Sequence, residues 1–310
     1  MPHTDRVHTP DHRLTGLGQR EVGRRGFLLA APVGLLALVT GTIGSSLLTP
    51  VGRAGSAVYD DARGLAESAL GSTRVRGALD AALLPIVGRS TVIGVSVLDR
   101  RTGTRWSYRG DSLAQTGSVS KVLVVAAALR KARAAGTSLS APQLEQVRLA
   151  ITRSDNASAD ALYAYIGGHQ AVARLAGDLG MTATATADTV PHWGNTLTTA
   201  NDLVTVMTAL TGGTPVLDAT DRALVLQRMA EVVDGQRWGV GTVRSSRVKV
   251  RVKNGWMRVD SPWVINSVGD VQGGGRDYVL AVLQRAQPDE DTGMTRASRI
   301  GRAVFTALAP

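Results

Sequence analysis

Residues 117–135 read GSVSKVLVVAAALRKARAA, and this stretch decides how the rest of the chain is interpreted. Its run of Val, Leu and Ala predicts a buried helix over residues 119–135, which Gly136 ends. Ser118 and Lys121 are three residues apart, so they share one face of that helix near its N-terminus. A lysine among apolar groups has a lowered pKa and can deprotonate a serine, so the pair suits a nucleophile and its base. An N-cap serine followed by a surface lysine would give the same letters, so the motif needs support from elsewhere in the chain.

Strand patterns lie on both sides of this helix, and helix patterns fill the sequence between them. Two strands precede the helix, at residues 91–98 and 104–108, and three follow it, at residues 247–253, 263–271 and 278–283. This order predicts an α+β protein, a three-layer α/β/α sandwich whose five-stranded antiparallel sheet is built from both ends of the chain. An inserted all-helical subdomain would meet the sheet at a cleft. The other expected helices cover residues 142–152, 157–166, 200–210, 221–233 and 295–308.

The composition of the 310 residues excludes several kinds of site. The chain has no Cys, which excludes disulfides, iron–sulfur clusters, thiolate zinc sites and a cysteine nucleophile. Three of the five His lie in the first twelve residues, so a three-histidine metal site is excluded from the body of the chain, where only His169 and His192 remain. We expect no metal and no cofactor. The net charge of +10 can indicate nucleic acid, but only 4% of the residues are aromatic, which leaves little for base stacking, and no nucleic-acid partner is expected.

The amino-terminal segment has the pattern of an export signal. Residues 26–52 carry no charge, and residues 27–48 are long enough as a helix to cross a bilayer core. Arg24-Arg25-Gly26-Phe27-Leu28 resembles a twin-arginine signal read by the export translocase, and Gly55-Ser56-Ala57 offers small residues for cleavage. An uncleaved anchor and a buried helix are the alternatives. The expected division is a twin-arginine-like export signal or anchor over 1–57, a linker or the start of the first helix over 58–73, and a folded domain outside the cytoplasmic membrane over 74–310.

Two further short motifs carry polar residues suited to chemistry. Ser154-Asp155-Asn156 lies between two predicted helices, where all three residue types are also favoured N-caps. Lys253-Asn254-Gly255 ends a predicted strand on which alternate residues from Arg247 to Lys253 are cations that share one face. A solvated face explains Arg247 and Lys249, whereas Lys253 comes just before a Gly that lets a ligand or another backbone approach closely. Each motif alone is ordinary, but their order along the chain is much less expected by chance.

With the three motifs in this order, the chain resembles the penicillin-recognising serine hydrolases, that is, class A β-lactamases and the related D,D-peptidases and transpeptidases. The resemblance runs from Arg74 to Ala309. It implies an exported serine hydrolase that acts on a β-lactam or a D-Ala-D-Ala-like amide through an acyl-serine intermediate. The other matching segments are GVSVLDRRTG at 94–103, SDN-x-x-A-x-x-L at 154–162, IGG at 166–168, TTA-x-DL at 198–203 and WVINSVG at 263–269.

The resemblance also implies a role for each matching residue. Ser118 would be the acylated nucleophile, Lys121 its proton acceptor, and Ser154 the group that passes a proton to the leaving nitrogen. The backbone N–H groups of Ser118 and Trp256 would form the oxyanion hole. Asn156 would hold the side-chain amide of the substrate, and Lys253 would attract its carboxylate. The full set of substrate-binding residues would be Asn156, Lys253, Asn254 and Gly255.

The chain departs from the family pattern in three places. The third motif reads Lys-Asn-Gly instead of Lys-Thr-Gly, and only 36 positions separate Ser118 from Ser154, fewer than in a typical class A enzyme. Class A enzymes also carry, in the segment that corresponds to residues 180–200, a Glu that activates the deacylating water, and this segment contains no Glu. Its polar candidates are Asp188, His192 and Asn195. His192 is the substitute base to test, and an exposed or capping loop residue is the alternative reading of it.

Three functions stay open on this sequence. The first is a class A β-lactamase-like serine hydrolase, and the second is a D,D-peptidase or transpeptidase-like enzyme that acts on peptidoglycan stem peptides. The third is a catalytically silent binding protein with the same frame. The partner would be a small-molecule β-lactam or a stem peptide, and a monomer is expected. Because the Glu is absent, we expect a burst of covalent labelling followed by slow turnover.

Overall fold

A computed structural model describes residues 51–186, 192–258 and 262–310, with side chains from residue 69 onward within these ranges. The chain divides into two units, Met1–Gly52 and Arg53–Pro310, and the description concerns the second. The predicted twin-arginine motif and the uncharged run behind it lie outside the described residues. Residues 55–57, the predicted cleavage site, and residues 58–73 belong to the first helix, α1 (Val51–Val87).

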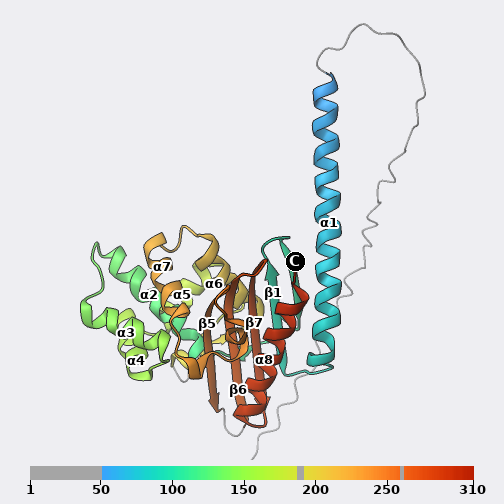
Figure 1. The fold of residues 1–310 in the computed structure, drawn as a ribbon. Coiled ribbons are helices and arrows are strands. Elements are labelled where there is room, and N and C mark those ends of the chain that lie inside the picture. Colours follow the sequence, from blue (N-terminus) through green and yellow to red (C-terminus); the bar gives the residue numbers. More distant parts are fainter. Residues whose placement is uncertain (1–50, 187–191, 259–261) are drawn as a thin grey trace, which may run out of the picture. The chain divides into compact units, whose positions relative to one another are not determined.

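The predicted five-stranded antiparallel sheet is confirmed (Figure 1). Its strands lie in the order β2-β1-β7-β6-β5, so the first strand of the chain pairs with the last. This pairing joins the two ends of the domain and leaves the helices between them as an insertion. The strands are β1 (Ile93–Asp99), β2 (Thr104–Tyr108), β5 (Val248–Arg258), β6 (Trp263–Gly273) and β7 (Arg276–Gln287).

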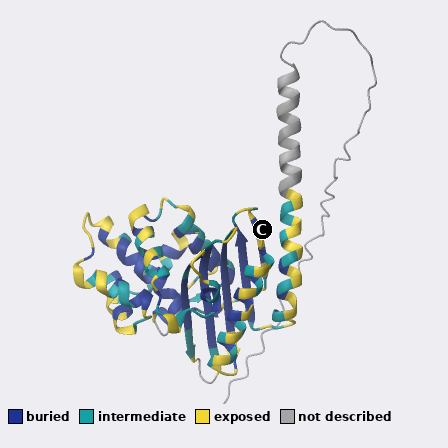
Figure 2. Cartoon of the chain, viewed as in Figure 1, coloured by how far each residue is buried: buried dark blue, intermediate teal, exposed yellow. Residues whose placement is uncertain are grey.

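Helices cover both faces of the sheet, which makes the three layers that were predicted. On one face α1 and α8 (Glu290–Ala307) bury Leu79, Leu83 and Ile300 against the strands. On the other face α2 (Lys121–Ala134) and α6 (Ala200–Gly212) share a second core with β6 and β7. The strands are therefore buried on both sides, whereas the helices are exposed on their outer faces (Figure 2).

The inserted subdomain packs around α2, which is buried over most of its length. Its other helices are α3 (Ala141–Thr152), α4 (Asn156–Ile166), α5 (His169–Asp178) and α7 (Ala219–Ala230). The α5 helix was not predicted, since Gly167-Gly168 marks a helix end and α5 is only 10 residues long. Its buried Val172, Leu175 and Ala176 nevertheless have helical spacing. Gly167 ends α4 in the left-handed conformation and Gly168 begins α5, so the pair is a sharp helix–helix connection.

A small second sheet joins the start of the insertion to its middle. β3 (Ala114–Gln115) pairs with β4 (Leu197–Thr198), and the Thr116 N–H donates to Thr196 O at 2.8 Å. This pairing sets the 3₁₀ turn η2 (Trp193–Asn195) beside the 3₁₀ turn η1 (Gly117–Ser120), where Thr116 Oγ1 donates to Trp193 O. Two further turns, η3 (Asp234–Gln236) and η4 (Gly239–Val243), lead into β5.

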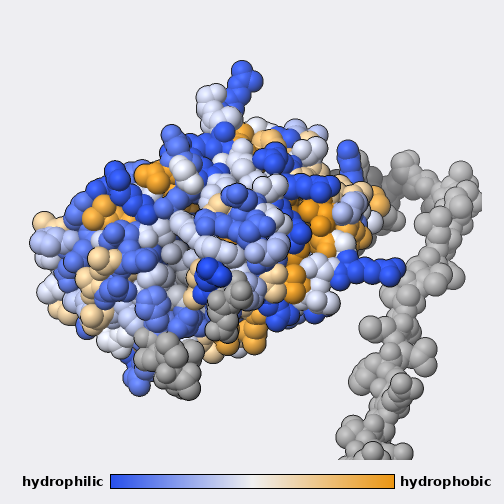
Figure 3. Space-filling model, turned by 90° about the horizontal axis from the view of Figure 1, so that it is seen from below, coloured by the Kyte–Doolittle hydropathy of each residue, from blue (hydrophilic) through white to orange (hydrophobic). Residues whose placement is uncertain are grey.

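The surface seen in Figure 3 is largely hydrophilic, with small hydrophobic areas between the polar ones. Among the described side chains, the large exposed hydrophobic residues are Leu70, Leu84, Leu113 and Leu144. None of the helices in the part of the chain that the structure describes is long and apolar enough to span a membrane.

Candidate active site

The predicted nucleophile lies in the η1 turn, immediately before α2, where the sequence predicted the first turn of a helix. Ser118 is 8% exposed. The β5 backbone lies directly against this turn, because a Cβ on Gly255 would stand only 2.5 Å from Thr116 O and 2.8 Å from Ser118 N. Glycine at position 255 therefore permits a close approach between the strand and the turn. The substrate contact expected for Gly255 stays a prediction.

Lys121 lies three residues after Ser118 and is fully buried. Its ammonium group donates to Ser154 O at 2.5 Å, to Asn156 Oδ1 at 2.8 Å and to Ser154 Oγ at 3.3 Å. Burial lowers the pKa of Lys121 to about 8, although Asp155 and Asp160 oppose the shift. A lysine with this pKa holds a useful fraction of neutral amine near neutral pH and can accept a proton.

Ser154 is placed by an unusual backbone conformation between α3 and α4. Its φ is +58°, a left-handed value that few residues other than glycine adopt. Asp155 follows as the N-cap of α4, accepting from Ser158 N at 2.7 Å, so it has the capping role that its residue type allows. Asn156 begins the helix, and its Oδ1 faces Lys121. Backbone strain at Ser154 thus turns its hydroxyl toward both lysines of the site.

Lys253 approaches the same hydroxyl from the sheet. It is 1% exposed, and its ammonium group donates to Ser154 Oγ and to Asn254 O, both at 2.9 Å. Burial, and then the neighbouring charge of Lys121, lower the pKa of Lys253 well below its usual value. The buried Lys253 therefore holds the Ser154 hydroxyl in this arrangement. Its attraction of a substrate carboxylate stays a prediction.

The Asn254 side chain turns away from the pocket. Its amide nitrogen donates to Gln236 O at 2.9 Å and to Trp238 O at 3.0 Å, which uses both of its hydrogens. Through these bonds Asn254 connects β5 to the η3–η4 segment. A contact between Asn254 and a substrate stays a prediction.

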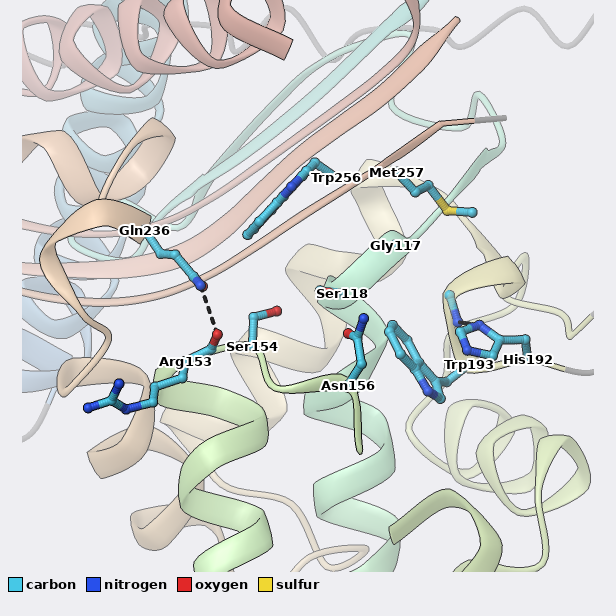
Figure 4. A pocket seen from close by; sticks show the side chains of 11 residues that line it. Gly117, Ser118, Arg153, Ser154, Asn156, His192, Trp193, Gln236, Trp256 and Met257 are labelled. Atoms are coloured by element: carbon cyan, nitrogen blue, oxygen red, sulfur yellow. Dashed lines mark hydrogen bonds between the residues drawn. The ribbon is translucent and has the colours of Figure 1, made fainter. Parts of the chain in front are cut away.

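A cavity of about 300 Å³ opens at the junction of these elements (Figure 4). Of the predicted residues, Ser118, Ser154, Asn156, His192 and Trp256 line it, while Lys121 lies beneath it. Lys253, Asn254 and Gly255 are not part of its lining. The remaining lining residues, which the sequence did not single out, are Gly117, Arg153, Trp193, Gly194, Gln236 and Met257.

Trp256 brings its backbone close to the nucleophile turn. A Cβ on Gly117 would stand 3.2 Å from Trp256 N, so the two predicted oxyanion-hole segments are neighbours. Asn266 on β6 holds the two residues that precede the η1 turn. Its Nδ2 donates to Gln115 O at 2.7 Å and to Thr116 O at 3.1 Å. Asn266 belongs to the WVINSVG segment, but nothing in its local pattern indicates this contact across the sheet.

The η2 side of the pocket carries aromatic rings. The indole of Trp193 lies over the Lys121 ammonium group at 4.4 Å, and its Nε1 donates to Asp160 Oδ1 at 2.7 Å. His192 accepts from Gly194 N at 3.1 Å through Nδ1, and its Nε2 lies 3.7 Å from Asp160 Oδ1. His192 thus caps its own turn through Nδ1, while its Nε2 faces Asp160 on α4. Its part as a substitute base stays a prediction.

None of the described residues that line the cavity is an Asp or a Glu. Asp188, one of the polar candidates, lies outside the described residues, and Asn195 is the last residue of η2. In the ranges that the structure describes, there is also no cluster of three metal-ligating residues. Ser118, Ser154 and Asn156 therefore line the pocket, and Lys121 and Lys253 lie behind Ser154. The described lining on the opposite side contributes no carboxylate.

Comparisons with known proteins show the family of the chain. The profile named Beta-lactamase2, described as the beta-lactamase enzyme family, matches residues 138–308, more than half of the chain. "Putative lipoprotein LppW" of Mycobacterium tuberculosis (strain ATCC 25618 / H37Rv) is 31% identical over 242 residues, which cover 76% of this chain and 74% of that protein.

Solved structures show the same fold. The TLA-1 extended-spectrum β-lactamase aligns with a TM-score of 0.66 and 16% identity, over 76% of this chain and 99% of its own. A class A β-lactamase from Bacteroides cellulosilyticus DSM 14838 aligns with a TM-score of 0.65 and 19% identity, over 76% and 98%. PBP-A aligns with a TM-score of 0.64 and 19% identity, over 74% and 95%. On its fold, its profile match and its relatives, the chain belongs to the beta-lactamase enzyme family.

Proposed function

We propose that the protein is a serine hydrolase in which Ser118 opens a β-lactam or a D-Ala-D-Ala-like amide and becomes acylated. The observation that carries this proposal is the buried Lys121, whose pKa is lowered to about 8 and which is bonded to the Ser154 hydroxyl at the base of the pocket that Ser118 lines. A nucleophile, a base and a hydroxyl that can relay a proton are thus gathered at one cavity.

The chemistry follows from these contacts. Ser118 Oγ attacks the carbonyl carbon while its proton passes to the neutral amine of Lys121, and Ser154 delivers a proton to the leaving nitrogen. The backbone N–H groups of Ser118 and Trp256 stabilise the oxyanion, each at about 3–4 kcal/mol in the transition state. None of the hydrogen bonds between described residues uses Ser118 Oγ, so its bond to Lys121 forms when substrate binds, as catalytic hydrogen bonds often do.

Release of the acyl group is the slow part of the proposed cycle. Deacylation needs a water held beside the ester by a base within about 3 Å. The described lining offers no carboxylate for this, and His192 has both nitrogens engaged. We therefore assign the protein a long-lived acyl-enzyme and slow turnover of β-lactams.

A D,D-peptidase or transpeptidase-like activity on peptidoglycan stem peptides is the second candidate. The described lining of the pocket contains no Asp or Glu, which favours this candidate, because an efficient lactamase needs rapid hydrolysis of its acyl-enzyme whereas an acyl-transfer enzyme does not.

Two substrates distinguish the candidates. We expect a chromogenic cephalosporin to give a stoichiometric burst followed by slow hydrolysis, which supports acylation without efficient lactamase activity. Release of D-alanine from a stem-peptide mimic would assign the second activity. Binding of a penicillin without any covalent adduct would show a catalytically silent binding protein and contradict the proposal.

We also propose that the hydrolase domain works outside the cytoplasmic membrane. The support is the Arg24-Arg25-Gly26-Phe27-Leu28 run before an uncharged segment, together with a relative that is named as a lipoprotein. Replacing both arginines, Arg24→Lys with Arg25→Lys, should retain the chain in the cytoplasm, as should deletion of residues 1–57. Unchanged export of the double variant would exclude the twin-arginine route.

A further inference from the structure

Protein groups surround the Lys121 ammonium group from several directions. An ammonium group has three N–H donors, and the three acceptors on Ser154 and Asn156 use all of them. The face of the Trp193 indole covers the group from a further direction, at 4.4 Å. Lys121 is consequently 0% exposed.

Trp193 is held firmly in this place. It is 4% exposed, its Nε1 donates to Asp160 Oδ1 at 2.7 Å, and its carbonyl accepts from Thr116 Oγ1 at 3.4 Å. The His192 ring lies 4.3 Å from it, centroid to centroid. In the view of Figure 4 the indole is drawn between Asn156 and His192, at the wall of the pocket that Ser118 lines. Trp193 is thus held by contacts to α4, to Thr116 and to His192. A water molecule cannot easily displace a ring that is held in this way.

We infer that Trp193 keeps hydrolytic water away from the acylated Ser118 and thereby lengthens the life of an acyl-enzyme whose described pocket lining already lacks a carboxylate base. The inference rests on the proposed acylation of Ser118 and names what controls its reversal. In deacylation a water oxygen bonds to the ester carbon, the bond from that carbon to Ser118 Oγ breaks, and a base takes the water proton while Oγ regains one. Lys121 is the base closest to Ser118 in sequence that could take the water proton, and the Trp193 indole occupies the space beside it.

The same contact acts on the protonation of Lys121. A cation over an indole face is stabilised, so Trp193 favours the charged form and opposes the effect of burial. A ring that merely filled space would lack this influence. Trp193 is thus a positioning residue with two separable effects, on water access and on the Lys121 titration.

The lifetime test uses three proteins, each incubated with a slight excess of penicillin and followed by intact-mass spectrometry. Trp193→Ala opens the wall beside Lys121, and we expect its adduct to disappear at least tenfold faster than that of the unmodified chain. Trp193→Phe keeps an aromatic face and most of the volume, and its adduct lifetime should stay within about threefold.

A second readout is the pH dependence of labelling. Trp193→Leu keeps the site dry but removes the π face, so the midpoint of acylation against pH should move down by about 0.5–1 unit. If circular dichroism shows that Trp193→Ala does not fold, two other variants test the inference. Trp193→Leu tests it through the labelling midpoint, and Asp160→Ala, which removes the acceptor of the indole N–H, tests it through the adduct lifetime. Asp160→Ala should shorten the adduct lifetime about threefold or more.

The outcomes separate the two claims. If the unmodified chain forms no adduct on Ser118, the proposed function fails and the inference with it. If the adduct forms but its lifetime stays within about twofold in folded Trp193→Ala, or in Asp160→Ala where Trp193→Ala does not fold, and the labelling midpoint of Trp193→Leu stays in place, Trp193 has only a structural role and the inference alone is overturned.

Discussion

The two sides of the pocket contrast in what they can do. The side built from η1, α2, the 153–156 segment and β5 brings Lys121 and Lys253 to the Ser154 hydroxyl by hydrogen bonds, at the cavity that Ser118 also lines. The η2 side presents Trp193, whose Nε1 donates to Asp160, and His192, whose Nδ1 accepts from Gly194 N. On the proposed mechanism, acylation depends on the first side and release of the acyl group on the second. One segment is equipped with proton-transfer groups, and the other with aromatic rings.

Removing the base from the first side should have the largest effect. Lys121→Met keeps the volume of the buried chain but cannot accept a proton, so acylation by a penicillin should fall by about 10²–10⁴-fold. Stopped-flow or quenched labelling measures this rate. Near-normal labelling of Lys121→Met would mean that another group deprotonates Ser118.

The unmodified chain should show the matching pH profile. Because burial lowers the pKa of Lys121 to about 8, the neutral amine is scarce below that pH and dominant above it. Acylation should rise nearly tenfold per unit between pH 6 and 7.5 and level off above pH 8. A flat profile from pH 6 to 9 would contradict a lysine base with this pKa.

Two lysines on one face of β5 test whether position matters. Lys253 is 1% exposed and donates to Ser154 Oγ, whereas Lys249 is exposed on the same strand face. Lys253→Ala should slow acylation by about one to two orders of magnitude, because a charge-assisted hydrogen bond is worth roughly 1.5–3 kcal/mol. Lys249→Ala is the matched control and should change little.

Substrates with and without a free carboxylate distinguish the two possible roles of Lys253. If Lys253 acts through Ser154, Lys253→Ala should slow acylation equally for a substrate with a free carboxylate and for its neutral ester. A loss confined to the carboxylate substrate would restore the direct role that the sequence predicted. Equal effects of Lys249→Ala and Lys253→Ala would indicate a diffuse basic surface.

The smallest effect is expected on the η2 side, at His192. Its Nδ1 caps Gly194 and its Nε2 faces Asp160, so His192→Gln, which retains polar atoms near both partners, should leave the adduct lifetime within about twofold. Intact-mass spectrometry over time measures this. A clearly longer lifetime would show that His192 serves as the substitute base after all.

The sequence predicted best what depends on short spacing. The Ser118–Lys121 pair needs only one turn of chain, and the capping of α4 by Asp155 follows from residue type and place. The order of strand and helix patterns was enough for the layers and for a sheet closed by both ends of the chain. Periodicity also placed the cations of β5 on one face.

Features that depend on tertiary contacts were out of reach. Strand periodicity does not give depth. The solvated face expected for Lys249 is found, but nothing indicated that Arg251 bonds to the buried Asp270 or that Lys253 is enclosed. Asn254 turns toward Gln236 and Trp238 because β5 runs beside η3 and η4. The place of Trp193 over Lys121 depends on the pairing of β3 with β4, two strands of two residues each.

Ser118 should be acylated readily, and its acyl group should be released slowly. A time course of intact mass after mixing the full chain with one equivalent of penicillin measures both steps. We expect one adduct per molecule, absent from Ser118→Ala, that forms early and persists while deacylation lags acylation by about 10²–10⁴-fold. Rapid consumption of many equivalents with no detectable adduct would contradict it, since a base that activates water would then have to face the acyl group.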